Sequence, residues 1–354
     1  MKKINIESLL GQTIYIGIDV HKKTFHVTIR SFDCELSSQS IPASWSALKK
    51  LLNPFKSLEM KVVYEAGYCG YWLSRHLSHW GVDCLVTPPS LIPQESGNRV
   101  KTDRKDSKKL AFYLSRDLLK SVYVPSEANL QQRKLIRHRR QLMGNRVRVQ
   151  NRIKAELSFH GQKLSSDQGS WTQSFLLELT NLAQSDSRFG LSMQMLLEEF
   201  HFLQEQILRL TQAIRQLAKS PQHQLNVQFL RSIPGVGLLT AMTFLLELED
   251  LTRFAQSDQI AAYVGLTPSQ FSSSDQIRMG HITRSGKADL RGMLVEAAWT
   301  LVRKDPYFKT KYQRLACRIG GKRAIVAIAR KLVILARRLI LDQTPYQPPV
   351  LQVV

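Results

Sequence analysis

The sequence predicts an α/β layer fold over roughly the first 120 residues and a mainly helical structure over the rest of its 354 residues. Two apolar runs, IYIGID and KVVYE, each end in an acidic residue, and amphipathic segments follow them. Strands that alternate with helices in this way are typical of a layered α/β domain. The chain is long enough for two or three domains, each with its own core.

Local patterns define the elements of the first domain. The run IYIGIDV indicates a buried strand, and TFHVTI alternates with a period of two, as a half-buried partner strand does. Ser44 is a good cap for the helix that follows it, and Gly81 ends a later one. The predicted strands lie within 14–31, 61–67 and 82–89, and the predicted helices span 44–53, 70–81 and 103–119.

The middle of the chain is strongly basic. Residues 128–155 contain no acid and carry an apolar stripe at helical spacing, which predicts one long helix. Its cations are Arg133, Lys134, Arg137, Arg139, Arg140, Arg146, Arg148, Arg152 and Lys154. Like charges repel one another within a lone helix, so we expect contacts with phosphates; the alternative is a solvated face of a helical bundle. Residues 161–190 are rich in Ser, Gln and Asp and predict a linker.

Two further patterns extend the helical region. From Leu196 to Leu217, apolar residues recur at spacings that alternate between four and three. This period favours a coiled coil, formed within the chain or between two chains. The segment 229–248 contains IPGVG before an apolar run and resembles the turn of a helix-hairpin-helix. Beyond it we expect helices with one polar loop at 269–287.

Composition restricts the classes of partner. The formal net charge of +22 favours a polyanion. No apolar run approaches the roughly 20 residues of a membrane helix, and the N-terminus does not have the pattern of a signal peptide. We therefore expect nucleic acid as the partner and the cytoplasm as the compartment. The four cysteines have no metal-binding spacing and suggest reduced, mostly buried thiols.

Four acids have a setting that suggests chemistry. Asp19 and Glu65 each follow an apolar strand, and Asp103 and Asp106 lie three residues apart at a helix start. Acids at the ends of neighbouring strands can meet at one edge of a sheet, where they would bind Mg²⁺ and act on phosphodiesters. The alternative is a surface helix on which the aspartates pair with nearby lysines. The two strand-end acids favour the metal site.

Six blocks in order carry a resemblance to a known family: GIDVHKKTFHV, VYEAGYCGYWL, NRVKTDRKDSKKLA, SIPGVGLLTA, AAYVGLTP and GHITRSGKADLRGMLVEAAW. Together the blocks resemble the DEDD transposases of bacterial insertion sequences of the IS110 type, from about residue 14 to about residue 340. The resemblance implies a RuvC-like N-terminal domain with an RNase H fold, a coiled-coil segment and a C-terminal transposase domain. The implied boundaries are 1–125, 126–225 and 226–345.

The same resemblance implies an activity and its residues. The activity is recombination of the element's DNA ends with a target, guided by an RNA that the element encodes. The implied compartment is the bacterial cytoplasm, in association with the nucleoid. Asp19, Glu65, Asp103 and Asp106 are the implied metal-binding acids, and a serine in the loop LTPSQFSSSDQIRMG is the implied nucleophile. Ser273 matches best. Relatives often have a glycine after the serine, where this chain has Ser274 and Asp275, so Ser272 and Ser274 are alternatives.

Basic residues beside the acids, on the basic helix and near the serine loop are candidate nucleic-acid contacts. They are Lys101, Arg104, Lys105, Arg137, Arg140, Arg148, Arg284 and Lys287. His21 is a candidate contact to metal or phosphate, and Tyr68, Tyr71 and Trp72 could pack in the core or stack on bases. Joining two DNA ends requires at least two active sites, so we expect a homo-oligomer, a dimer or a tetramer.

Two other functions compete with the transposase. A metal-dependent nuclease of the junction-resolvase type would use the acids alone, with water as the nucleophile. A nucleic-acid-binding protein without catalysis would use the acids only structurally. The long C-terminal region with its serine loop exceeds what a resolvase needs, which favours the transposase.

Overall fold

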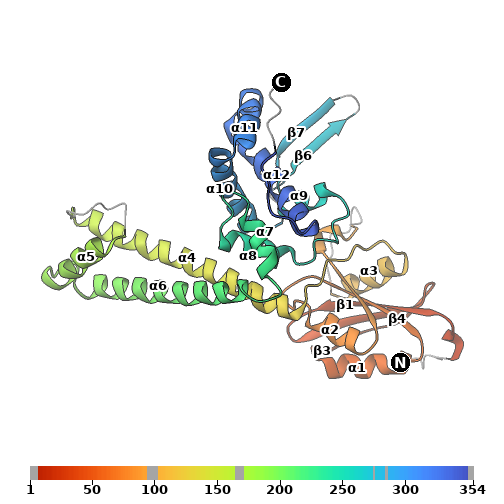
Figure 1. Ribbon diagram of the computed structural model, residues 1–354. Helices are drawn as coiled ribbons and strands as arrows, with labels where there is room; N and C mark the ends of the chain where they lie inside the picture. The colour runs from red at the N-terminus through yellow and green to blue at the C-terminus, as the bar shows by residue number, and fades with distance from the viewer. Residues whose placement is uncertain (1–6, 94–102, 164–170, 274–275, 284–285, 350–354) are drawn as a thin grey trace. The chain divides into compact units, whose positions relative to one another are not determined.

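The chain divides into two compact units, Met1–Val124 and Pro125–Val354, in the computed structural model (Figure 1). The structure describes residues 7–93, 103–163, 171–273, 276–283 and 286–349; for residues 103, 271–273 and 276–279 it describes the backbone alone. Buried apolar residues form separate cores in the two units.

A five-stranded mixed sheet in the order β3-β2-β1-β4-β5 is the centre of the N-terminal unit. β1 pairs antiparallel with β2, and β2 with β3, whereas β1, β4 and β5 are parallel. This mixed α/β sheet is consistent with an RNase H-like fold. The strands are β1 (Thr13–Val20), β2 (Thr24–Arg30), β3 (Glu35–Pro42), β4 (Glu59–Glu65) and β5 (Asp83–Thr87). The sequence patterns missed β3, because ELSSQSIP is a polar edge strand without apolar alternation.

Helices cover both faces of this sheet. Leu48 and Leu52 of α1 and Leu73 and Leu77 of α2 pack into one core with the even-numbered residues of β1. α3 covers the other face, where Leu110 packs against β4. Ser44 caps α1 by accepting a hydrogen bond from the Ala47 N–H, as predicted. The helices are α1 (Trp45–Leu52), α2 (Trp72–His79) and α3 (Asp103–Ser115), with short 3₁₀ turns at Glu7–Leu9, Asn53–Phe55 and Pro89–Leu91.

Gly17 allows α3 to lie directly on β1. A Cβ atom at this position would come within 2.2 Å of the Ser107 carbonyl oxygen and 2.5 Å of the Ala111 nitrogen. Both of these atoms belong to the backbone of α3, so they could not move aside without shifting the helix. The hydroxyl of Thr28 on β2 contacts that of Ser107 at 2.8 Å and fixes the same contact point.

A long helical hairpin begins the C-terminal unit. α4 (Glu127–Phe159) and α6 (Gly190–Ala218) run side by side, and α5 (Gln173–Ser185) packs against α6 (Figure 1). The predicted linker at 161–190 is therefore wrong in part, because the apolar residues of QSFLLELTNLAQS form α5, which buries Phe175, Leu179 and Ala183. The four-three seam of α6 packs against α4 of the same chain. A coiled coil between two chains is not needed to bury it.

The rest of the C-terminal unit is a helical body with one small sheet. The expected polar loop is instead a two-stranded antiparallel hairpin, because apolar and polar residues alternate along IRMGHI. The predicted turn around IPGVG joins two helices, as expected. The elements are α7 (Gln224–Arg231), α8 (Leu238–Leu248), α9 (Ser257–Val264), β6 (Pro268–Ser273), β7 (Gln276–Ile282), α10 (Ala288–Lys304), α11 (Pro306–Ile319) and α12 (Gly321–Leu341).

The cysteines are all free thiols. Cys34 and Cys317 are exposed, so the expectation of mostly buried thiols is wrong for these two. Burial raises the pKa of Cys84 to about 12, which keeps this thiol protonated and unreactive. Among the described residues, no helix combines the length and the apolar character that a membrane crossing requires.

Candidate active site

Two of the predicted acids lie at the same end of neighbouring strands. β1 and β4 are parallel, and Ile18 pairs with Tyr64, so Asp19 and Glu65 are the next residues along each strand. Neighbouring strands lie about 4.8 Å apart. Alternation places both acids on the sheet face that α3 covers, because Gly17 contacts α3 and Val63 packs with Leu110. We call this place the acid edge, defined by Asp19, Glu65 and the start of α3.

α3 brings the other two acids toward the same edge. Ser107 lies over Gly17, and five residues later Phe112 lies under Arg30, at the far end of β2. α3 therefore runs away from the acid edge, and its first turn, with Asp103 and Asp106, lies at the near end. Asp106 is half-buried. The side chain of Asp103 lies outside the described residues.

Two further side chains border the acid edge. His21 Nε2 lies 3.1 Å from Asp19 Oδ2, so this imidazole contacts the first acid directly. The Tyr68 hydroxyl donates to the Val20 carbonyl oxygen at 3.3 Å, and its ring is 63% exposed. Trp72 instead packs against Phe25, with ring centroids 6.2 Å apart. Of these aromatic residues, Tyr68 is the one that presents an open ring beside an acid.

The donors at the acid edge are suited to a hard divalent cation. Asp19, Glu65 and Asp106 offer carboxylate oxygens, the ligands that Mg²⁺ prefers. Among the residues whose side chains the structure describes, no three His, Cys, Asp or Glu side chains are grouped closely enough to hold a metal ion. Mg²⁺ is usually held by few carboxylates together with waters or a substrate phosphate, and the acids of this edge are of the type that such a site needs.

A small basic groove lies beside α3, between this helix and β2. Its hollow of about 290 Å³ is lined by Thr28, Arg30, Glu35, Lys105, Lys108, Lys109 and Phe112. Lys108 pairs with Glu35 at 2.9 Å. The Arg30 guanidinium lies 4.9 Å from the centre of the exposed Phe112 ring. The sequence patterns predicted Lys105 but missed Arg30 and Phe112, since their proximity depends on the packing of α3 on β2.

The predicted nucleophile lies at the tip of the β6–β7 hairpin. Ser273 is the last residue of β6 and pairs with Gln276, whereas Pro268 pairs with Ile282 at the hairpin base. His281 is exposed near that base, and its carbonyl oxygen accepts a hydrogen bond from the Ser269 hydroxyl at 3.0 Å. The hairpin therefore holds Ser273 and His281 near opposite ends. The side chains of Ser272 and Ser273 lie outside the described residues, as do Lys101, Ser274 and Arg284.

A buried carboxylate anchors the segment that follows the hairpin. Glu247 of α8 accepts two hydrogen bonds from Arg137, both at 2.8 Å, and pairs with Lys287 at 3.2 Å. Arg133 lies 3.9 Å from the same carboxylate and donates to the Leu246 carbonyl oxygen at 2.9 Å. Burial raises the pKa of Glu247, but the Arg137 hydrogen bonds and the charges of Lys287 and Arg133 outweigh it, so the net pKa is lowered. We call these four side chains the Glu247 network.

Several cations of the basic helix thus have acidic partners from other elements. Besides Arg133 and Arg137, Arg140 pairs with Asp289 at 2.6 Å, and Arg152 pairs with Glu199 at 2.7 Å. The sequence of α4 contains no acid over this stretch, but the tertiary structure supplies them. Arg148 is exposed and donates to Asn145 of its own helix, so it is the most open of the predicted α4 contacts.

Comparison with known families accounts for both units. Residues 16–161 match the family of DEDD transposases of the IS110 type, and residues 227–313 match the transposase IS116/IS110/IS902 family. These two segments together cover about two thirds of the chain, and they include the acid edge and the serine hairpin. The chain therefore belongs to the IS110 family of transposases, a class of enzymes that transfer DNA strands.

Individual relatives agree with this assignment. The protein y4qE of Sinorhizobium fredii, provisionally named a transposase, is 30% identical over 269 residues, which is 76% of this chain and 65% of the relative. The transposase for insertion sequence element IS1533 of Leptospira borgpetersenii is 29% identical, over 68% of this chain and 71% of its own length. The transposase for IS1111A of Coxiella burnetii is 28% identical, over 81% and 79%. Membership of the DEDD family implies a divalent metal cation.

Proposed function

We propose that this protein cuts and rejoins DNA at the ends of an insertion sequence, with Mg²⁺ at the acid edge and Ser273 as the nucleophile. The observation that carries the proposal is the placement of Asp19 and Glu65 on adjacent parallel strands, facing the helix that begins with Asp103 and Asp106. Two carboxylates on one face at one edge of a sheet repel each other, and a bound cation would offset that repulsion.

Each acid has a defined part in this proposal. Asp19, Glu65 and Asp106, with Asp103, would hold the cation, which would supply charge stabilisation to the phosphate in transit. His21 would orient the Asp19 carboxylate through the 3.1 Å contact. Tyr68 would offer its exposed ring to a base next to the scissile phosphate. The α3 groove, with Arg30, would hold the backbone of the strand.

Ser273 would carry out the covalent step. Its oxygen forms a bond to phosphorus, the bond from phosphorus to one strand oxygen breaks, and that oxygen leaves as a hydroxyl with the proton that the serine gives up. One phosphodiester is exchanged for another, so the reverse reaction can join a new strand without ATP. The serine and the acids act on the same phosphate in this proposal, from one chain or from two chains of a homo-oligomer.

We also propose that the protein binds a guide RNA that the element encodes. The charge of +22 supports binding to both DNA and RNA. The guide would select the DNA sequence by base pairing, and the protein's side chains would contact the sugar-phosphate backbone. Sequencing of the RNA that co-purifies with the protein tests this part: an abundant short transcript from beside the gene supports it, and only bulk cellular RNA contradicts it.

The catalytic proposal is tested with labelled DNA that carries the element's ends. Asp19→Asn and Glu65→Gln should abolish strand cleavage in Mg²⁺ while DNA binding persists. Asp33→Asn, which changes an exposed acid in the same unit, is the matched control and should cleave like the wild type. Cleavage that survives the acid variants would refute the acid edge. Cleavage that survives Ser273→Ala would favour the nuclease of the resolvase type.

A further inference from the structure

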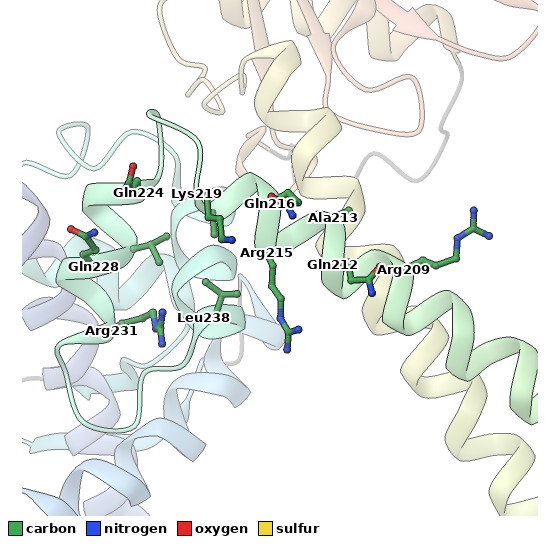
Figure 2. A pocket seen from close by; sticks show the side chains of 12 residues that line it. Arg209, Gln212, Ala213, Arg215, Gln216, Lys219, Gln224, Gln228, Arg231 and Leu238 are labelled. Carbon is green, nitrogen blue, oxygen red and sulfur yellow. The ribbon is translucent and has the colours of Figure 1, made fainter.

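We propose that a second basic groove, in the C-terminal unit, binds the phosphodiester backbone of a nucleic-acid strand. This proposal rests on the proposed function and adds a contact site that lies outside the acid edge and the serine hairpin. The groove lies along the end of α6, α7 and the start of α8 (Figure 2) and encloses about 960 Å³. It is lined by Arg209, Gln212, Ala213, Arg215, Gln216, Ala218, Lys219, Gln224, Val227, Gln228, Arg231 and Leu238.

The lining carries charge of one sign. Four of its side chains are cations, from Arg209 to Arg231, and none is an acid. The sequence itself contains no Asp or Glu from 206 to 246. Within the described part of the chain, one carboxylate approaches a cation of the lining: Glu205 lies 4.0 Å from Arg209. A surface with cations and no counter-charge costs electrostatic energy in the free protein, and a bound polyanion removes that cost.

Three cations of the groove differ from several cations of α4 in that the described residues give them no carboxylate partner. Arg133, Arg137, Arg140 and Arg152 of α4 all contact carboxylates from other elements. In the groove, Arg215, Lys219 and Arg231 have no such partner among the residues that the structure describes, and all three are exposed. We call them the groove cations. Acids from other elements thus pair with four of the nine cations of α4 named above, whereas the groove cations keep their charge open to phosphates.

The arrangement fits a strand and not a single ion. Figure 2 shows Arg215 on α6 and Arg231 at the end of α7 extending on either side of Leu238. Cations from two helices can therefore contact successive phosphates. Four glutamines, Gln212, Gln216, Gln224 and Gln228, also line the groove, and their amides can donate to phosphate oxygens or contact sugars and bases. Ala213, Ala218, Val227 and Leu238 add apolar surface, against which the sugar face of a strand can pack.

The test uses the full-length chain with three groove cations changed, Arg215→Gln, Lys219→Gln and Arg231→Gln. The control variant carries Arg314→Gln, Arg318→Gln and Lys322→Gln, which remove the same charge from exposed positions of the same unit outside the groove. Binding to a short labelled DNA duplex, its single strand and the matching RNA is measured over a range of salt concentrations. Circular dichroism and the melting temperature establish that both variants are folded.

The groove variant should lose affinity by roughly ten- to hundredfold for at least one of these probes. The slope of log affinity against log salt should fall by about two to three, since each phosphate contact contributes about 0.9 for duplex DNA. The control should change both quantities much less. A probe-specific loss identifies DNA or RNA as the strand in the groove. Equal losses in the two variants would overturn the proposal, since bulk charge would then explain them.

Lysine acetylation adds a local measurement. In the wild type, acetylation of Lys219 should be slowed at least severalfold when the preferred nucleic acid is bound, while that of Lys322 stays the same. If nucleic acid binds but Lys219 is not protected, the groove proposal fails and the proposed function stands. If a poly-glutamate peptide protects Lys219 and nucleic acid does not, the groove is a protein-binding site and the proposal fails as well. If the wild type binds neither DNA nor RNA, both proposals fail.

Discussion

Replacing Glu247 with glutamine should destabilise the C-terminal unit more than any exposed acid-to-amide change. The side chain of Glu247 is 8% exposed and contacts Arg137, Lys287 and Arg133. Glutamine keeps the shape but removes the negative charge. Arg133, whose side chain is 7% exposed, would keep its hydrogen bond to the Leu246 carbonyl oxygen and have Glu249 as its remaining carboxylate, at 3.9 Å.

The expected loss in unfolding free energy depends on how exposed each cation that contacts Glu247 is. Removing one partner of a buried ion pair typically costs about 3–5 kcal/mol, because the other charge is left uncompensated. Arg137 is 50% exposed and can be solvated, so its share is small. Arg133 is buried and would lose a carboxylate that water cannot replace, but it keeps Glu249 as a partner. The expected loss therefore lies at the lower end of the range of about 3–5 kcal/mol. We therefore expect a loss of about 3 kcal/mol in the free energy of unfolding, or a melting temperature lower by about 6–12 °C.

Thermal unfolding of the full-length protein measures this effect, with Glu198→Gln on the exposed side of α6 as the matched control. The control should change the unfolding free energy by less than about 0.5 kcal/mol. Because the folded pKa of Glu247 is below its ordinary value of 4.5, its stabilisation is fully present above that pH and is lost as the pH falls through the lowered folded pKa. The difference between wild type and Glu247→Gln should shrink accordingly in acid. A loss below about 1 kcal/mol at neutral pH would refute the role of the network.

Two further predictions concern the N-terminal unit. Gly17→Ala should destabilise it by more than about 3 kcal/mol and weaken cleavage, because the new methyl group would meet the backbone of α3 at 2.2 Å; Gly144→Ala in α4, with nothing within 4 Å, should stabilise the chain by about 0.5–1 kcal/mol. Equal melting temperatures for these two variants would contradict the close packing of α3. Chelation with EDTA should stop strand cleavage and Mg²⁺ should restore it, and Asp106→Asn should raise the Mg²⁺ concentration needed or abolish activity; cleavage unchanged in EDTA would exclude a metal role.

Much of the N-terminal unit could be predicted from the sequence, because its signals are local. The apolar run of β1, the cap at Ser44 and the stop at Gly81 each follow from a few neighbouring residues. β3 was missed because an edge strand with one buried neighbour needs little apolar character. α5 was missed because its apolar residues lie within a longer stretch, 161–190, that is rich in Ser, Gln and Asp.

The candidate site was predicted by its residue types, and its surroundings were not. Asp19 and Glu65 could be paired in advance, since each ends an apolar strand, and the parallel register of β1 and β4 brings the two positions level. No pattern along α4 indicates that Glu247, more than a hundred residues away, pairs with Arg137. Pairings of this kind depend on tertiary packing, and they decide which cations stay open to a nucleic acid.

Mass spectrometry of protein incubated with DNA that carries the element's ends tests the central claim most directly. Serine-mediated cleavage predicts a peptide that carries a nucleotide on Ser273, in Mg²⁺, and its loss in both Ser273→Ala and Asp19→Asn. Ser269→Ala, in the same hairpin, should keep the adduct. Cleaved DNA without any covalent adduct, at a rate that Ser273→Ala leaves unchanged, would contradict the account.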